Sequence, residues 1–259
     1  TYYMNKKTYL KIGTLVLLVV ISAPQISFAA RLDKVDLTKG LKGDGAQFCV
    51  MIDRRSADLD TKINQKLQQL QTRRNDRATE RATHRSDRDA QIASHRGQAD
   101  TRHDTRFATL DAKATTDVQK AAVIEFKASV NTAVENRRTA VDAAIRDFRS
   151  AVDGLTGTQK AKVDAALADF NIARTAAINK AKASCTAGTD SATVKTAFDV
   201  DMKAAKDAFK AAKDTITKKA DVDAAAATRK AAIDTAISNF KTAMTAAQDK
   251  LKLAFPKAQ

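Results

Sequence analysis

The chain has 259 residues with no tryptophan, only two prolines and eight glycines, and 29% charged residues. With so few helix-breaking residues and no mixed α/β pattern, the composition predicts an all-α protein. No glycine-rich phosphate loop and no clustered catalytic or metal-ligating motif occurs in the sequence. We therefore expect no enzymatic activity, no cofactor and no small-molecule substrate. The formal net charge of +15 favours contact with anionic surfaces such as phospholipid, cell-wall polymer or nucleic acid.

Residues 1–29 have the composition of a secretory signal peptide. Three lysines come first, an apolar run follows over residues 12–23, and Ser27 and Ala29 provide small residues before a cleavage point. Met4 is the expected start, with residues 1–3 as an upstream extension. A membrane-spanning helix needs about 20 apolar residues, so we favour cleavage over an uncleaved anchor. This predicts export to the periplasm, the cell envelope or the exterior, and a charge of +12 once the three signal lysines are removed.

The rest of the chain is predicted to consist of a flexible lead over residues 30–45 and one elongated helical domain over residues 46–255. Thr116 and Gln119 have the spacing of a capping box, and Gly188 has the character of a helix C-terminal stop before an N-cap at Asp190 or Ser191. The glycines at 154 and 157 are expected to interrupt the second helix. The expected helices cover residues 46–114, 117–152 plus 158–187, and 190–254.

An eleven-residue repeat runs through the first predicted helix. It is marked by hydroxyl side chains at Thr61, Thr72, Thr83, Ser94 and Thr105. The segments 141–148 and 163–170 resemble each other at twice that spacing. Eleven residues complete three turns at about 3.67 residues per turn, so one face returns to the same side of a nearly straight helix. The repeat predicts long, rod-like helices.

The two cysteines select between two topologies. In an exported protein an even count favours a disulfide, here between Cys49 and Cys185. These residues lie 67 positions before and 69 positions after a predicted turn near Thr116. An elongated antiparallel bundle of three long helices would bring them together, and this is the predicted fold. The alternative is a four-helix arrangement with a hairpin at residues 154–157, which would separate the cysteines.

Arginine is concentrated in one stretch of the first predicted helix. Residues spaced by four share a stripe, and such a stripe could bind an anionic polymer through its phosphates. The candidate anion-binding residues are Arg73, Arg74, Arg77, Arg81, Arg85 and Arg88. Interleaved acidic residues favour a merely solvated charged helix instead. The nearby His84, His95 and His103 are also expected to be solvated, because His84 and His95 stand about 16 Å apart along a helix, too far to hold one metal.

The segment Leu155-Thr156-Gly157-Thr158-Gln159 resembles the LTxxQ motif of the small periplasmic helical chaperones of the Spy/CpxP type. The resemblance covers five residues and implies an exported, all-helical protein. The leading hypothesis is an exported structural or interaction protein that acts as a spacer or scaffold, with an unknown protein partner or self-association. The alternatives are a basic helical module that binds anionic polymer or a membrane surface, and a chaperone-like periplasmic protein.

Overall fold

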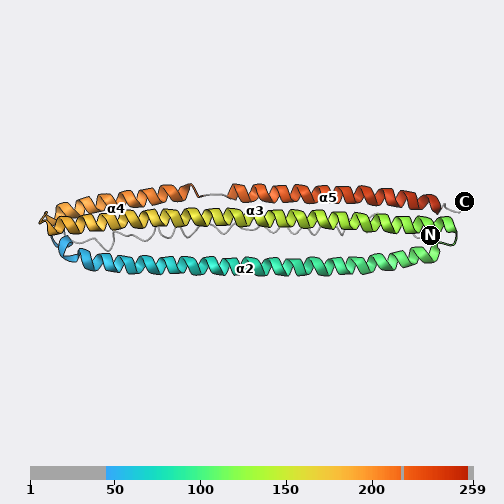
Figure 1. The fold of residues 1–259 in the computed structure, drawn as a ribbon, viewed down its shortest axis with the longest axis horizontal. Helices are drawn as coiled ribbons and strands as arrows, with labels where there is room; N and C mark the ends of the chain where they lie inside the picture. The colour runs from blue at the N-terminus through green and yellow to red at the C-terminus, as the bar shows by residue number, and fades with distance from the viewer. Residues whose placement is uncertain (1–44, 217–218, 256–259) are drawn as a thin grey trace. The chain divides into compact units, whose positions relative to one another are not determined.

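The computed structural model describes residues 45–216 and 219–255, and this part of the chain is helical, with no β-strand (Figure 1). The elements are the 3-10 helix η3 (Gly45–Gln47) and the α-helices α2 (Phe48–Lys113), α3 (Asp117–Thr186), α4 (Ser191–Asp214) and α5 (Lys219–Ala254). The predicted all-α class is confirmed. The predicted signal peptide and all of the predicted flexible lead except Gly45 lie outside the described residues.

The helix ends follow the capping signals in the sequence. The backbone N–H of Gln119 donates to Thr116 Oγ1 at 3.2 Å, and the N–H of Thr116 donates to Gln119 Oε1 at 3.2 Å, which confirms the capping box. Gly188 ends the α3 region with a φ of +76°, a backbone conformation that a side chain would disfavour. Asp190 caps α4 by accepting from the N–H of Thr193 at 3.0 Å.

The predicted interruption of the second helix at residues 154–157 is wrong. α3 runs unbroken for 70 residues through both glycines (Figure 1). Each glycine in a helix interior costs about 1 kcal/mol relative to alanine, and no proline is present to remove a hydrogen bond. Val152 is buried and Leu155 is partly buried beside these glycines. Tertiary packing of the apolar face therefore outweighs the local signals for a helix start.

The prediction of a single last helix over residues 190–254 is also wrong, because this segment contains two helices, α4 and α5. α4 ends at Asp214, where the N–H of Thr215 donates to the carbonyl of Ala212 and the N–H of Ile216 donates to that of Lys213. These bonds span three residues and tighten the last turn. Thr215 Oγ1 also donates to the carbonyl of Ala212 at 2.7 Å, and Ile216 is buried. A threonine and a buried isoleucine thus end α4 without glycine or proline.

The chain divides into two compact units, each built from segments of several helices. The disulfide unit consists of described residues between 45 and 83 and between 154 and 219. The turn unit consists of residues 84–153 and 220–255. The prediction of one helical domain over residues 46–255 stays a prediction.

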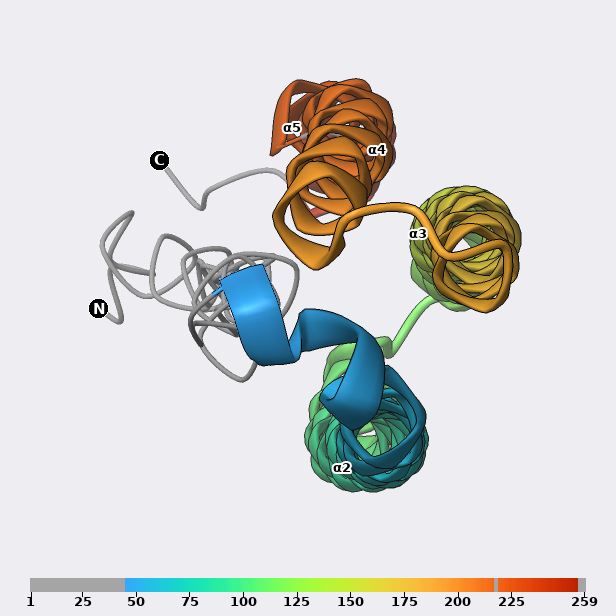
Figure 2. The same ribbon diagram turned by 90° about the vertical axis from the view of Figure 1, so that its left-hand side faces the viewer.

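The disulfide unit has an apolar core. Its buried cluster combines Phe48 and Ile52 of α2 with Phe170 of α3 and with Phe198 and Met202 of α4. The rings of Phe48 and Phe198 lie 5.4 Å apart between centroids. Cys49 and Cys185 form a disulfide with 5.4 Å between their Cα atoms, as predicted. Figure 2 shows α2, α3 and α4 as separate helices.

The turn unit has a different interior. α3 contributes buried apolar residues, including Val123, Val130 and Phe148, while α5 buries only Ala236 and Ala247. The four buried residues of α2 all precede residue 71, so the segment of α2 in this unit buries none. Apolar burial is therefore supplied almost entirely from one of the three helices, and other forces must hold α2 here.

The eleven-residue repeat determines which side of α2 faces inward. The buried or partly buried positions recur in three series, which are 48, 59, 70, 81, 92, 103, then 52, 63, 74, 85, 96, 107, and then 55, 66, 77, 88, 99, 110. The repeated threonines and Ser94 are all exposed. The inward positions are apolar at the start of the helix, but several later ones are arginine. The residue type at the inward positions therefore changes along α2 while the period stays constant.

Candidate functional site

A set of ion pairs joins α2 to α3 along the turn unit. Five pairs connect the two helices, and the residue numbers of each pair add to 238, as expected for antiparallel helices in one constant register. They are Arg85–Asp153 (2.8 Å), Arg96–Asp142 (2.7 Å), Arg138–Asp100 (2.6 Å), Arg149–Asp89 (2.6 Å) and Lys127–Asp111. We call these the cross-helix ion pairs.

The cross-helix ion pairs form two rows of opposite polarity, each with an eleven-residue step. In one row α2 supplies the cations, Arg85 and Arg96. In the other row α2 supplies the anions at 89, 100 and 111, and α3 supplies the cations at 149, 138 and 127. Sliding one helix by a few residues would separate every pair and bring like charges together. The arrangement therefore specifies the register of the two helices.

Most of the cross-helix ion pairs are bidentate. Both terminal nitrogens of Arg85, Arg96, Arg138 and Arg149 donate to the two oxygens of one aspartate. The hydrogen bond from Arg149 lowers the pKa of Asp89, and that from Arg138 lowers the pKa of Asp100. The aspartates are about half exposed, so each pair contributes at most about 1 kcal/mol. Their effect comes from number and periodicity.

The disulfide unit contains ion pairs of its own between α2 and α3. Arg74 pairs with Asp164 at 2.7 Å, and Lys182 pairs with Asp53 at 2.7 Å. Arg174 is 8% exposed, and its Nη1 lies 2.6 Å from Asp60 Oδ1. A cation buried to this extent would be costly without its anion. These pairs flank an apolar core and a disulfide, so they supplement other forces here.

Cation–π contacts join α3 to α5 in the turn unit. The guanidinium of Arg137 on α3 lies 4.2 Å from the ring centroid of Phe240 on α5, and the guanidinium of Arg229 on α5 lies 4.2 Å from that of Phe148 on α3. Each helix thus contributes one arginine and one phenylalanine, eleven residues apart. Burial lowers the pKa of Arg137 and of Arg229, with smaller contributions from neighbouring cations. Such contacts are worth about 0.5–2 kcal/mol each.

The six arginines predicted to bind anions have different surroundings. In the disulfide unit Arg73 is exposed, Arg74 pairs with Asp164, and Arg77 and Arg81 are partly buried. In the turn unit Arg85 pairs with Asp153.

Arg88, the sixth of these arginines, is partly buried in the turn unit. Arg74 and Arg85 are thus occupied by carboxylates of α3, and the partial burial of Arg77, Arg81 and Arg88 places them on the inward series of α2. Anion binding by the six residues as an exposed stripe stays a prediction.

The aspartates that receive these arginines were not among the predicted site residues. Asp142, Asp153 and Asp164 recur every eleven residues on α3, as do Asp89, Asp100 and Asp111 on α2. This periodicity is visible in the sequence. The disulfide between Cys49 and Cys185 sets the register between α2 and α3, because the residue numbers of the two cysteines add to 234. This sum is within about one helical turn of the 238 found for the ion pairs. The eleven-residue period and the disulfide together therefore indicate which arginines and aspartates pair.

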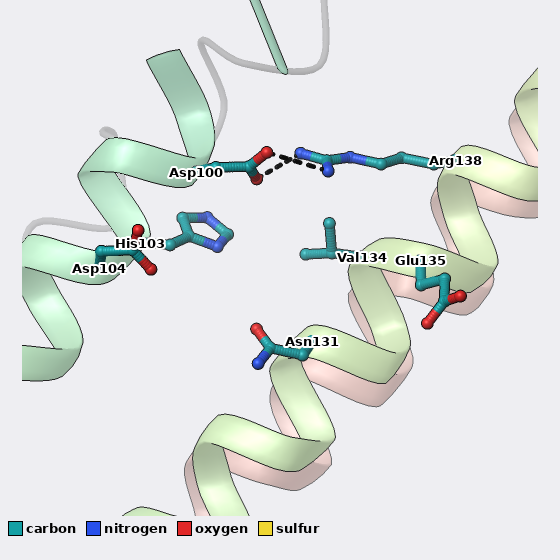
Figure 3. A pocket seen from close by; sticks show the side chains of 7 residues that line it. All are labelled: Asp100, His103, Asp104, Asn131, Val134, Glu135 and Arg138. Carbon is teal, nitrogen blue, oxygen red and sulfur yellow. Dashed lines mark hydrogen bonds and ion pairs between the residues drawn. The ribbon is translucent and has the colours of Figure 1, made fainter. Parts of the chain in front are cut away.

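A shallow groove lies beside one cross-helix ion pair (Figure 3). Asp100, His103 and Asp104 line it from α2, and Asn131, Val134, Glu135 and Arg138 line it from α3. His103 was expected to be solvated, but it is partly buried, with its ring 6.1 Å from that of Phe107. Burial, and then the charge of Arg106, lowers its pKa.

No group of histidine, cysteine, aspartate and glutamate side chains within residues 45–216 and 219–255 has an arrangement that could hold a metal ion. Over the same residues, no helix combines the length and apolar character needed to span a membrane. No protein family model, curated protein or solved structure matches the chain.

Proposed function

We propose that this chain is an exported, non-enzymatic structural protein of the cell envelope or extracellular space that acts as a spacer or scaffold. The cross-helix ion pairs are the observation that carries this proposal. Their side chains bind each other rather than converging on a ligand, and they recur along the helix rather than clustering at one point. Such a pattern serves to keep two antiparallel helices in a constant register.

The length of the individual helices supports the same function. α2 has 66 residues and α3 has 70, so each extends for about 100 Å at about 1.5 Å per residue. An isolated helix of this length frays and bends, and lateral contacts at every third turn oppose both. An eleven-residue repeat suits this purpose, because its contacts return to one face without strong supercoiling.

The disulfide supports export and adds a covalent clamp. It joins residues 136 positions apart, at the first turn of α2 and the last turn of α3. Disulfides persist in oxidising compartments outside the cytoplasm. A covalent bond there prevents these two helix ends from separating.

Binding of an anionic polymer along the arginines of α2 is less well supported. Two of the six candidates, Arg74 and Arg85, already donate to aspartates of α3. A polymer would have to compete with these carboxylates. If binding to duplex DNA is steeply salt-dependent and is lost when Arg73, Arg77 and Arg81 are changed to Gln, this alternative replaces the scaffold.

In vivo photo-crosslinking tests the scaffold directly. Val50 near the start of α2 is 85% exposed, and Val118 near the start of α3 is 71% exposed. A photoreactive residue at each position should trap specific partners, and the two positions should trap different ones. Ala93, an exposed residue in the middle of α2, is the matched control. Identical products at all three positions, or none at Val50 and Val118, would contradict the proposal.

A matched shortening tests whether helix length matters. Deleting residues 86–96, 142–152 and 225–235 removes one eleven-residue repeat from each helix of the turn unit and retains the pairing of Arg85 with Asp153 and of Arg138 with Asp100. We expect this variant to fold, but we do not expect it to replace the full-length protein functionally in its native cells. The control deletes six residues from each helix, which rotates the faces apart, and should lose cooperative unfolding. If the shortened protein fully replaced the full-length protein in those cells, this result would contradict the spacer function.

A further inference from the structure

Arg88 and Arg229 of the turn unit take no part in the cross-helix ion pairs. Arg229 of α5 is partly buried and stacks on the buried ring of Phe148, 4.2 Å from its centroid. Arg88 of α2 is partly buried on the inward series of that helix. Within residues 45–216 and 219–255, no acidic side chain forms an ion pair with either of them. Both guanidinium groups therefore retain donors for another acceptor.

The helix registers bring Arg88 and Arg229 to one level of the turn unit. Asp89, the neighbour of Arg88, pairs with Arg149 on α3, and Arg149 follows Phe148, on which Arg229 stacks. Electrostatics agrees with this placement. The pKa of Arg229 is lowered by burial first and then by the positive charge of Arg88.

The neighbouring ion pairs supply no counter-charge to Arg88 and Arg229. The nearby Arg85–Asp153 and Arg149–Asp89 pairs are each neutral. Arg88 and Arg229 thus leave two positive charges in a partly desolvated interior, where their mutual repulsion opposes the packing of α5 against the other helices.

We propose that Arg88 and Arg229 form a binding site for a phosphate group, which bridges the two guanidinium groups and holds α5 against α2. Planar guanidinium groups suit a tetrahedral oxyanion, because each presents paired N–H donors to two oxygens. The phosphate is either free inorganic phosphate or a phosphate monoester. The inference does not depend on the proposed spacer function.

The turn unit contains a matched control for this site. Arg137 stacks on Phe240 in the same way as Arg229 stacks on Phe148, with the same 4.2 Å separation. However, the residue of α2 that lies one repeat after Arg88 is Ala99. The level of Arg137 thus has a single stacked guanidinium and no second arginine in the position of Arg88. Arg102, which is exposed, controls for the loss of one positive charge.

Calorimetric titration with inorganic phosphate and with glycerol phosphate, at constant ionic strength, tests the site. The full chain should bind at least one of them, and R88Q and R229Q should each weaken binding about tenfold. R137Q and R102Q should bind like the unaltered protein, and circular dichroism should show the same helix content throughout. Tighter binding of glycerol phosphate would identify the monoester as the source, and tighter binding of inorganic phosphate the free ion.

A thermal measurement separates this site from the general stabilising effect of phosphate salts. Phosphate should raise the melting temperature of the unaltered chain and of R137Q more than that of R88Q and R229Q. No binding by the unaltered chain, or equal loss of binding in R88Q, R229Q, R137Q and R102Q, would overturn the proposal.

Discussion

The two units of this protein share an eleven-residue period but are stabilised differently. In the disulfide unit the inward positions of α2 include Phe48, Ile52 and Leu70, and these join an apolar cluster with α3 and α4. In the turn unit Arg85 and Arg96 occupy the phase of Ile52 and donate to aspartates of α3. The period alone therefore does not determine what kind of contact is made. It determines only which positions meet, and the residue type decides between burial and ion pairing.

This difference has a consequence for stability. Burial of apolar groups increases the free energy of unfolding by about 25 cal/mol for each Å² removed from water, whereas each partly exposed ion pair contributes little to it. The turn unit should therefore be the weaker of the two, and its stability should depend on salt.

Loss of the disulfide should have the largest effect. The bond closes a loop of 136 residues, and removing it should lower the free energy of unfolding by up to about 5 kcal/mol on the loop-entropy estimate. Changing both Cys49 and Cys185 to Ser, followed by urea denaturation, measures this. If the unaltered and serine-containing proteins unfold at the same urea concentration, the clamp contributes nothing.

Truncation of one phenylalanine in each unit should give unequal losses. Phe198 is 3% exposed and stacks with Phe48, so Phe198→Ala should cost about 3–5 kcal/mol. Phe240 is only partly buried and chiefly supports Arg137, so Phe240→Ala should cost about 1–2 kcal/mol. Urea denaturation of both variants provides the comparison. A larger loss for Phe240→Ala would reverse our ranking of the two units.

Charge reversal should test the cross-helix ion pairs one at a time. Asp89→Arg alone or Arg149→Asp alone places like charges opposite each other and should destabilise the protein by about 1 kcal/mol. The double variant should recover most of that loss, because the pair is restored with opposite polarity. Additive losses in the double-mutant cycle would show that the two residues are not coupled.

Histidine 103 should contribute a small pH dependence. Burial lowers its pKa in the folded state, so the unfolded chain binds a proton more readily. Stability should therefore be complete above the unfolded pKa of about 6.5 and should decrease as the pH falls from there towards the folded pKa. His103→Gln should flatten the slope of the free energy of unfolding across this interval. An unchanged slope would mean that other groups cause it.

Much of the fold could be predicted because its signals are local. Thr116 and Gln119 form a complete capping box within four residues, and Gly188 and Asp190 end one helix and begin the next. The continuity of α3 through Gly154 could not be predicted from the same signals, because tertiary burial of residues such as Val152 outweighs them. The end of α4 at Asp214 involves threonine and isoleucine, which do not ordinarily mark a helix end.

The ion pairs between α2 and α3 could be predicted only in part, because they too depend on contacts between helices. The arginines of α2 were identified from their spacing, but their partners lie on another helix, 46–90 residues away in sequence. Recognising them requires the register between helices as well as the period within each. Asp142, Asp153 and Asp164 supply the period, and the cysteines supply the register.

Hydrogen exchange of α2 in low and high salt tests the contrast between the units most directly. Because the cross-helix ion pairs are partly exposed, 1 M NaCl should screen them strongly. Backbone amides of residues 84–113 should then exchange about tenfold faster, while those of residues 48–70 change little. Equal acceleration of both segments, or greater acceleration of residues 48–70, would contradict it.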